Sequence, residues 1–293
     1  MTGKSVSGAN GRQGYSPDLD EELSRKLSSL KERLRGIGRC AVAFSGGVDS
    51  ALLLAVAHSV LGKDIVAITA NSKAVPAREV EATRAFCAKR GIDHVVVDTH
   101  EFEIEGFDRN PPDRCYICKR EILTRISQAA AAKGMNVIVE GSNLDDEGDY
   151  RPGFKAVTEF GVASPLRDAG FRKADVRALA RHLGLDEWNK LAFACLNTRF
   201  AFGEHITPQK LAMVDAAEEF LREMGFKQVR VRVQGNLARI EVPPSSIEGL
   251  AVEQMRNRVV TALKNLGFSY VTVDLQGYRT GSMNETLGQN ALD

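Results

Sequence analysis

Short apolar runs alternate with longer amphipathic stretches through the N-terminal part of the chain. Leucines at helical spacing between Leu19 and Leu34 predict an amphipathic helix. The run Cys40 to Ser45 predicts a strand and Asp49 to Leu61 a helix, with two glycines between them. The same signals predict strands over 65–70, 94–97 and 136–140, and helices over 78–90, 116–133 and 173–183. Strands that alternate with helices imply an α/β fold, in which helices cover both faces of a parallel sheet.

The pattern changes near Pro208, where strand-like runs and helices no longer alternate regularly. The elements expected there are a helix over 208–224, strands over 228–234 and 237–242, a helix over 247–266 and a strand over 270–275. They form a smaller α+β domain. The expected organisation is a tail over 1–18, an α/β domain over 19–185, a cysteine-bearing loop over 186–207, the α+β domain over 208–285 and a tail over 286–293.

The composition narrows the partners and the compartment. The chain has 39 Lys and Arg against 38 Asp and Glu, so its net charge is +1 and gives no overall field for nucleic acid. No apolar run approaches the about 20 residues of a membrane span. The first 18 residues lack the apolar core of a secretion signal, and five cysteines are an odd number for a disulfide framework. We therefore expect a cytoplasmic protein without a membrane partner.

The segment Ser45-Gly46-Gly47-Val48-Asp49-Ser50 stands between the first strand and its helix. Two glycines let the backbone bring N–H groups to an anion, and the helix adds its positive end. Ser45 and Ser50 can donate hydroxyl hydrogen bonds to phosphate, and Asp49 can cap the helix or help to hold Mg²⁺. The string is neither a Walker A loop nor a dinucleotide motif. It predicts a site for nucleotide phosphates, with an ordinary glycine-rich turn as the alternative.

Polar residues also follow two other predicted strands. Thr69, Ala70 and Asn71 end the second strand, and a later strand leads into Gly141, Ser142, Asn143 and Asp145. In open α/β sheets, ligands bind at the edge where the strands end. We therefore expect both groups near the phosphate loop, although simple turn chemistry also accounts for these residue types.

Three of the five cysteines can meet at one centre. Cys115 and Cys118 lie just before or inside the first turn of a predicted helix, and Cys195 is the third thiol. The basic residues next to the pair are expected to lower the thiol pKa, and they are Arg114, Lys119 and Arg120. Three thiolates can hold a [4Fe–4S] cluster and leave one iron open. A structural zinc site, a redox dithiol and plain buried cysteines remain alternatives.

The loop at 45–50 resembles the SGGxDS loop of the ATP-pyrophosphatase superfamily, which includes NAD synthetase, GMP synthetase and tRNA-thiolating enzymes. The resemblance implies that this loop grips the β,γ-pyrophosphate of ATP, which leaves when AMP is transferred. It also implies ATP contacts at the neighbouring strand ends, with the adenine beside the second strand. The residues concerned are Thr69, Ala70, Asn71, Gly141 and Asn143.

Six further segments point to a narrower family. They are NPPDRCYICK at 110–119, GSNLDDEGDYRPG at 141–153, ACLNTRF at 194–200, RVR at 230–232, ARIE at 238–241 and DLQGYRTGS at 274–282. Together they closely resemble the ATP-dependent sulfur transferases that help to build the nickel-pincer cofactor of lactate racemase. The resemblance spans roughly residues 19 to 285, so it covers both domains.

This resemblance implies a defined reaction with ATP and Mg²⁺. A carboxylate of a pyridinium-3,5-dicarboxylic acid mononucleotide is adenylated, and sulfur then displaces AMP. One type of family member sacrifices a cysteine at the position of Cys195, which becomes dehydroalanine. The other type holds a [4Fe–4S] cluster on three cysteines and is recharged with sulfide. Because cysteine stands at Cys115, Cys118 and Cys195, we expect the cluster type. The resemblance also implies a sulfide donor, other cofactor-maturation enzymes as partners, and a homo-oligomer, a hexamer.

Three residues of the smaller domain are candidates for substrate binding and catalysis. Arg230 and Arg232 lie two apart on a predicted strand, so their side chains share one face and suit a phosphate or carboxylate. The resemblance supports that role and adds Glu218 as an acid, base or metal partner. The alternatives are a solvated strand face and a solvated helix face. One position departs from the family pattern, because Leu191 stands where a proline is expected after Lys190.

Three other functions fit part of the pattern. A tRNA thiolase uses a similar loop and three cysteines, but the near-neutral charge speaks against it. An amide-forming ligase of the NAD synthetase kind needs no cysteine trio. A nucleotide-binding sensor would hold ATP without turnover.

Overall fold

The computed structural model describes residues 19–146, 153–191 and 194–279. Its larger sheet has four parallel strands in the order β3-β2-β1-β4. The bounds are β1 (Cys40–Ala43), β2 (Ile65–Asn71), β3 (His94–Asp98) and β4 (Ile138–Val139). The predicted α/β class with a parallel sheet is confirmed. The strand expected over 136–140 pairs only at Ile138 and Val139, so it is shorter than predicted.

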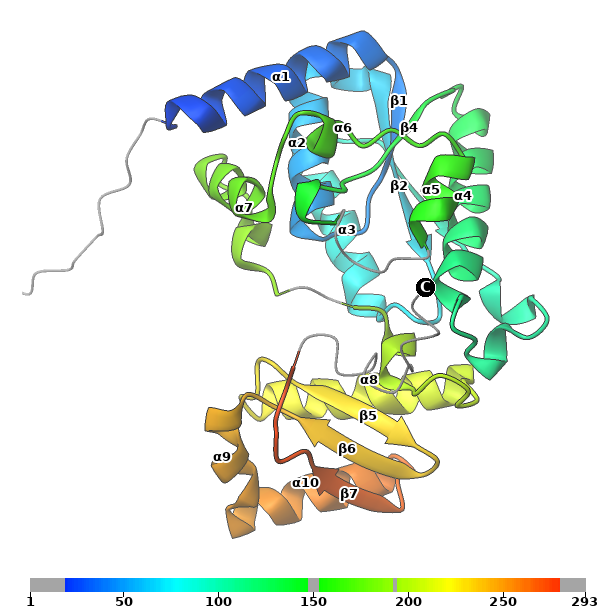
Figure 1. Ribbon diagram of the computed structural model, residues 1–293, viewed down its shortest axis with the longest axis vertical. Coiled ribbons are helices and arrows are strands. Elements are labelled where there is room, and N and C mark those ends of the chain that lie inside the picture. The colour runs from blue at the N-terminus through cyan, green and yellow to red at the C-terminus, as the bar shows by residue number, and fades with distance from the viewer. Residues whose placement is uncertain (1–18, 147–152, 192–193, 280–293) are drawn as a thin grey trace, which may run out of the picture.

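Helices cover both faces of this sheet (Figure 1). They are α1 (Glu21–Ile37), α2 (Val48–Leu61), α3 (Ala77–Arg90), α4 (Arg114–Ala132), α5 (Gly153–Glu159), α6 (Pro165–Asp168) and α7 (Lys173–His182). Ile65 and Ala67 of β2 face the core that α1, α2 and α7 complete, whereas Val66 and Ile68 face α4. Two of these helices, α5 and α6, were not predicted. Over the described residues, no helix combines the length and apolarity needed to cross a bilayer.

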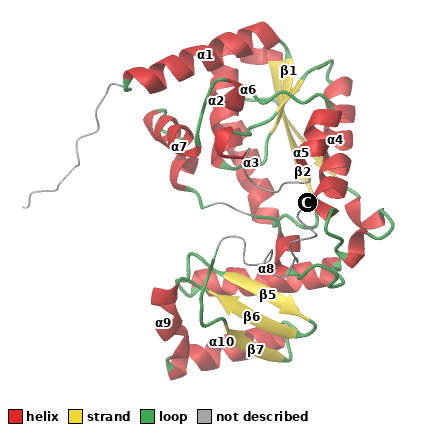
Figure 2. Ribbon diagram, in the orientation of Figure 1, coloured by secondary structure: helices red, strands yellow, loops and turns green. Residues whose placement is uncertain are grey.

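The second lobe is a three-stranded sheet with helices on one side (Figure 2). Its elements are α8 (Pro208–Glu223), β5 (Arg230–Gln234), β6 (Leu237–Glu241), α9 (Ile247–Ala251), α10 (Glu253–Asn265) and β7 (Tyr270–Val273). β5 and β6 are antiparallel, and β7 joins β6 in parallel. The single helix expected over 247–266 is wrong, because the backbone leaves the helical region at Val252 (φ −56°, ψ 131°). The sequence pattern missed this break because both halves carry apolar residues at helical spacing.

The segment 194–207 connects the lobes and is held by both. The Leu196 N–H donates to the carbonyl oxygen of Ala74, which follows β2 (2.9 Å). Phe200 forms a parallel bridge with Val233 of β5. A further link joins α3 to α8, where Arg78 pairs with Asp215 (2.7 Å). Cys195 therefore lies in a segment fixed between the two sheets.

Candidate active site

The phosphate loop has the backbone of an anion site. Gly46 has φ +74°, and a Cβ added there would lie 2.9 Å from Thr83 Cγ2, so the position favours glycine twice over. Gly47 caps α2 without a side-chain hydrogen bond, which leaves the N–H groups of the first turn directed at the loop. The buried Ser50 hydroxyl donates to the Gly47 carbonyl oxygen (3.1 Å) and lies 3.1 Å from the exposed Ser45 hydroxyl. Ser45 is thus the more accessible of the two hydroxyls.

Asp49 does not cap the helix, which was one of the two expected roles. Its carboxylate pairs with Lys173 at the start of α7 and accepts a hydrogen bond from Asn143 Nδ2 (3.1 Å). The lysine is half-exposed and can swing away on its flexible stem. The Lys173 ammonium thus balances the charge of this carboxylate, and its departure would free Asp49 Oδ2 for a cation. Among the described residues, the structure has no group of three His, Cys, Asp or Glu side chains arranged around one metal ion.

The predicted strand ends come together at this edge. A Cβ on Gly141 would lie 2.8 Å from the Ser50 nitrogen, so the chain after β4 packs directly on the phosphate loop. Asn143 is buried and hydrogen-bonded to Asp49. Thr69 lies inside the fold, where its hydroxyl donates to the Phe44 carbonyl oxygen (2.7 Å). The backbone at the predicted adenine position is therefore fixed by the core, not by exposed loops.

The outer residues of these strand ends remain accessible. Ala70 is half-buried, and Asn71 is exposed and donates from Nδ2 to Asp98 Oδ1 (2.7 Å). Ser142 donates to Glu140 (2.8 Å), and Asp145 pairs with Arg172 (2.8 Å). These placements leave the predicted adenine contacts as predictions.

A second lysine lies on the phosphate loop, and sequence analysis missed its role. Lys190 Nζ donates to the Gly46 carbonyl oxygen (3.1 Å) and pairs with Glu79 of α3 (2.6 Å). In the sequence, Lys190 is distinguished only by the leucine that follows it in place of a proline. The next residue, Leu191, is exposed, and positions 192–193 of that segment lie outside the described residues. The chain that leads to Cys195 thus starts at the phosphate loop.

The three predicted cysteines gather where α4 begins. Cys115 is exposed, and Cys118 and Cys195 are half-buried. Burial raises the pKa of the Cys118 thiol, and the neighbouring Glu101, Cys195 and Cys115 raise this pKa further. Burial likewise raises the pKa of Cys195, to which Cys115 adds. Each of these effects requires proximity, so the three thiols share one region.

The expected lowering of the thiol pKa is wrong for Cys118 and Cys195. Lys119 does lower the pKa of Cys118, and Arg114 that of Cys195, but burial outweighs both. Solvent weakens the stabilisation that a nearby positive charge gives to a thiolate. Burial instead removes the water that would stabilise the charged sulfur directly. Burial therefore favours the neutral thiol at both positions.

The three thiols match the donor set of a [4Fe–4S] cluster. Such a cluster binds three cysteines through three different irons, so the sulfurs need not converge on one point. Two come from one turn of α4 and the third from the segment between the lobes. Glu101 lies near Cys118 with its Oε2 buried and without a hydrogen-bond partner in the described structure. The residues fit the group by chemistry.

A fully buried ion pair contacts the backbone at Cys195. Arg199 and Glu218 of α8 are both 0% exposed and meet at 2.7 Å. Arg199 also donates to the carbonyl oxygens of Ala194 (2.9 Å) and Cys195 (3.2 Å). Glu218 is therefore no solvated helix residue, and Arg199, which no prediction named, anchors the cysteine segment. The sequence feature that indicates this role is the arginine within residues 196–200.

The two arginines of β5 are buried as well. Arg232 pairs with Glu241 of β6 (2.8 Å) and donates to the Thr198 carbonyl oxygen (2.8 Å). Arg230 lies over the ring of Tyr278 (5.4 Å from its centroid). Burial lowers the pKa of Arg230, and the positive charge of Arg199 adds to this shift. A solvated strand face is wrong, because both arginines are buried and Arg232 contacts the segment after Cys195.

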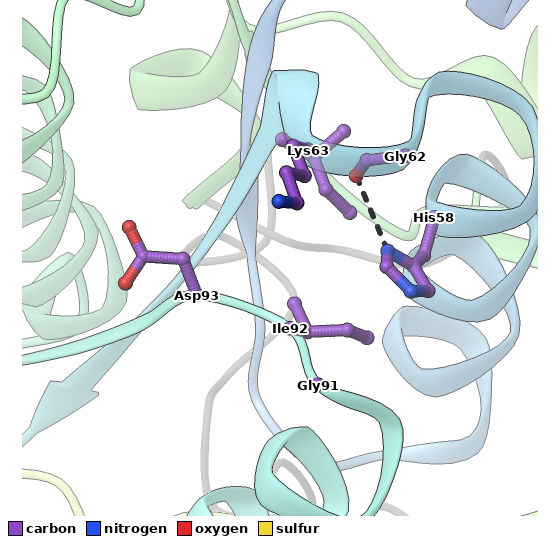
Figure 3. Close-up of a pocket in the computed structure, with 7 residues that line it drawn as sticks. His58, Gly62, Lys63, Gly91, Ile92 and Asp93 are labelled. Atoms are coloured by element: carbon purple, nitrogen blue, oxygen red, sulfur yellow. Dashed lines mark hydrogen bonds between the residues drawn. The ribbon is translucent and has the colours of Figure 1, made fainter.

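A cavity of about 460 Å³ lies at the other end of the sheet (Figure 3). Its lining residues are His58, Gly62, Lys63, Ile65, Gly91, Ile92 and Asp93. The strands β2 and β3 begin there, whereas the phosphate loop follows the end of β1. None of the predicted site residues lines this cavity.

Comparison with known proteins identifies the family. Residues 23–141 match the asparagine synthase family model. The pyridinium-3,5-bisthiocarboxylic acid mononucleotide synthase of Lactiplantibacillus plantarum is 40% identical over 271 residues, which are 92% of this chain and 98% of that protein. The chain belongs to this synthase family. An uncharacterized protein of Synechocystis is 43% identical over 90% of this chain and 99% of its own.

Membership of the family confirms the broader predictions. The chain is an ATP-dependent sulfur-transferring enzyme with an ATP-pyrophosphatase loop. A more distant relative, a glutamine-hydrolyzing GMP synthase chain of Thermococcus kodakarensis, is 25% identical over 70% of this chain and 72% of its own. The roles of individual residues stay predictions.

Proposed function

We propose that this enzyme adenylates the two carboxylates of a pyridinium-3,5-dicarboxylic acid mononucleotide and converts them to thiocarboxylates. The observation that carries the proposal is a pair of contacts on either side of Cys195: Lys190 binds the phosphate loop, and the Thr198 carbonyl oxygen accepts a hydrogen bond from Arg232 of β5. These contacts would place the sulfur of Cys195 between an ATP site and an anion site. The name of the Lactiplantibacillus relative supports the identity of the substrate.

The first half of the reaction uses the phosphate loop. An oxygen of the substrate carboxylate attacks the α-phosphorus of ATP, and the bond from that phosphorus to the pyrophosphate breaks. The N–H groups at the start of α2 and the ammonium groups of Lys173 and Lys190 would stabilise the leaving charge. Asp49 would hold Mg²⁺ once Lys173 turns to the phosphates. A bare carboxylate has no usable leaving group, so adenylation must precede sulfur transfer.

The second half forms a C–S bond as the C–O bond to AMP breaks. We propose that Cys115, Cys118 and Cys195 hold a [4Fe–4S] cluster, which when bound supplies an iron site for an external sulfide. A sacrificial Cys195 is the competing source. It would end as dehydroalanine, because its own sulfur leaves with the product. The presence of three thiols in one region favours the cluster.

Arg230 and Arg232 would bind the anionic mononucleotide. Their burial strengthens any contact with phosphate, since little water competes. Arg232 touches the Thr198 carbonyl oxygen, three residues beyond Cys195, so substrate bound there would lie beside the sulfur. Glu218 acts on this arrangement through Arg199. We therefore propose that Glu218 is a positioning residue for the cysteine segment 194–207.

The remaining assignments extend the same proposal. The five free thiols suit a reducing, cytoplasmic setting. A sulfide donor and other cofactor-maturation enzymes would be partners, and the chain would form a homo-oligomer. Nucleic acid and membrane have no part in the reaction.

An anaerobic assay tests the function. The enzyme is mixed with ATP, MgCl₂, sulfide and the dicarboxylate mononucleotide, and pyrophosphate and thiocarboxylate are measured by enzymatic coupling and mass spectrometry. We expect one pyrophosphate per thiocarboxylate formed. Cys195→Ala should retain pyrophosphate release and lose sulfur transfer. Adenylation of tRNA, amide formation by a variant without the three thiols, or ATP binding without pyrophosphate would each support a rival function instead.

Iron and acid-labile sulfide analysis separates the two sulfur sources. A reconstituted protein that binds iron through the three cysteines and turns over repeatedly supports the cluster. An iron-free protein that loses the mass of H₂S at Cys195 after turnover supports sacrifice.

A further inference from the structure

Asn110 has an unusual backbone conformation for a residue other than glycine. Its φ of +54° is the one positive value among the described residues other than glycine, and its side chain is fully buried. Left-handed backbone is unfavourable for residues with a Cβ and persists only where the surroundings enforce it. Asn110 is therefore held in place by specific contacts.

These contacts reach a segment 90 residues away in the sequence. Asn110 Nδ2 donates to the carbonyl oxygens of Phe200 (3.2 Å) and Ala201 (2.6 Å). The Gly203 N–H in turn donates to the Asn110 carbonyl oxygen (3.0 Å). Arg114 donates to Asn110 Oδ1, so every polar group of the amide side chain is used.

The contacts of Asn110 join the two cysteine-bearing segments. Asn110 precedes Cys115 by five residues, and Phe200 follows Cys195 by five residues. Arg114, which Asn110 binds, is buried and lies over the ring of Phe202 (4.7 Å from its centroid).

The position requires the chemistry of asparagine. Asparagine tolerates left-handed backbone better than most residues, and its amide offers donors for two carbonyls and an acceptor for a guanidinium. Aspartate would turn a carboxylate toward the two carbonyl oxygens. Glycine would suit the backbone but would remove every side-chain hydrogen bond. Glycine thus isolates the side chain's contribution from backbone strain.

We infer that Asn110 is a positioning residue that holds Cys195 opposite Cys115 and Cys118 and so assembles the three-thiol site. The inference rests on the proposed function for its purpose, but the assembly of the thiols can be tested without ATP or substrate. Asn110 acts through the segment 200–203, to which it is bound. The ATP site lies on other elements and does not depend on it.

The test uses Cd²⁺ as a probe of thiol assembly in the iron-free, full-length protein, where the three sulfurs must move onto one ion because no three ligating side chains of the described residues surround a single point. The ultraviolet charge-transfer absorption of Cd²⁺–thiolate bonds is titrated under anaerobic conditions in the wild type, Asn110→Gly, Cys195→Ala and the double variant. We expect Asn110→Gly to weaken Cd²⁺ binding about tenfold or more, as loss of a group that orients metal ligands does. The double variant should bind Cd²⁺ no more weakly than Cys195→Ala, because Asn110 acts through that thiol.

Two controls separate positioning from general loss of structure. Asp20→Ala removes the side-chain cap of α1, where Asp20 Oδ1 accepts from the Leu23 N–H (2.7 Å), and should lower the thermal midpoint without changing Cd²⁺ binding. In Asn110→Gly, pyrophosphate release with ATP and the dicarboxylate should keep its rate while sulfur transfer falls.

Several results would overturn the inference. Wild-type Cd²⁺ affinity in Asn110→Gly would do so, and so would equal Cd²⁺ affinities of the wild type and Cys195→Ala. Equal effects of Asn110→Gly in the presence and absence of Cys195 would show that the residue acts elsewhere. A wild type that binds Cd²⁺ as expected but releases no pyrophosphate would instead refute the proposed function alone.

Discussion

The buried pair Arg199–Glu218 offers the sharpest test of which contacts hold the cysteine segment 194–207 in place. The perturbation is Glu218→Leu, which removes a carboxylate that accepts four hydrogen bonds. Two come from Arg199, one from Arg222 Nη2 (2.8 Å) and one from the Val231 N–H (3.1 Å). Leucine fills the space but leaves the Arg199 guanidinium buried without its counter-charge.

The size of the effect follows from the burial of both partners. Removing one partner of a buried ion pair costs about 3–5 kcal/mol of unfolding free energy, a large part of the about 5–15 kcal/mol of a whole protein. Arg199→Met should cost a similar amount. The double variant should lose only about 1–3 kcal/mol, which reflects the Ala194 and Cys195 carbonyl oxygens left without their donor.

The assay is urea unfolding followed by circular dichroism in the wild type, both single variants and the double variant. The exposed pair Lys89–Asp186 provides the control, since Asp186→Leu should change the unfolding free energy by less than about 1 kcal/mol. Single costs that add up in the double variant would refute the buried pair as the stabilising unit. A single cost as small as that of the exposed pair would also refute it.

The same pair sets a pH dependence. Burial alone would raise the pKa of Glu218, but the Arg199 hydrogen bond and charge lower it below its ordinary value. The contribution of Glu218 is therefore present above the unfolded pKa of about 4.3 and is lost as the pH falls through the lower folded pKa. The stability difference between wild type and Glu218→Leu should narrow below about pH 4.

Three further predictions concern the nucleotide lobe. Gly46→Ala should weaken ATP binding, measured by equilibrium dialysis, about tenfold or more, because alanine strains the left-handed backbone and contacts Thr83. The control Gly91→Ala introduces similar backbone strain (φ +66°) in open space and should leave ATP binding unchanged. Lys173→Met should free its partner, the Asp49 carboxylate. We expect half-maximal pyrophosphate release at a lower Mg²⁺ concentration and a lower maximal rate, and an unchanged Mg²⁺ dependence would contradict the role of the ion pair. Burial lowers the pKa of His94, so thermal stability should be full above about pH 6.5 and fall below it, whereas His94→Gln should show a flatter profile.

The sequence by itself determined the larger lobe and its ATP chemistry. Alternating apolar runs and helices predicted all four strands of the parallel sheet, because β1 and β2 are buried on both faces and the half-buried edge strand β3 is still a continuous apolar run. Gly46 and Gly47 marked the phosphate loop, since a tight turn before a helix permits few other residues. Features of this kind depend on residues that are close together in the sequence, so the sequence alone predicts them.

The sequence also selected the three thiols, but it misjudged their environment. Basic residues beside Cys115 and Cys118 suggested a lowered pKa, whereas burial raises the pKa of Cys118 and Cys195. Desolvation depends on atoms from several distant segments, so no local pattern reports it. The break between α9 and α10 at Val252 escaped notice for a related reason, because periodicity continues across it.

Only the tertiary structure decided what holds the cysteine segment. The bonds from Asn110 to residues 200 and 201, from Arg199 to Glu218, and from Lys190 to the phosphate loop join positions far apart in the sequence. Each depends on two backbones meeting at hydrogen-bond distance, which the fold alone determines. The residue types were visible from the start. Their pairing arises from packing, and it links the predicted ATP site to the proposed site of sulfur transfer.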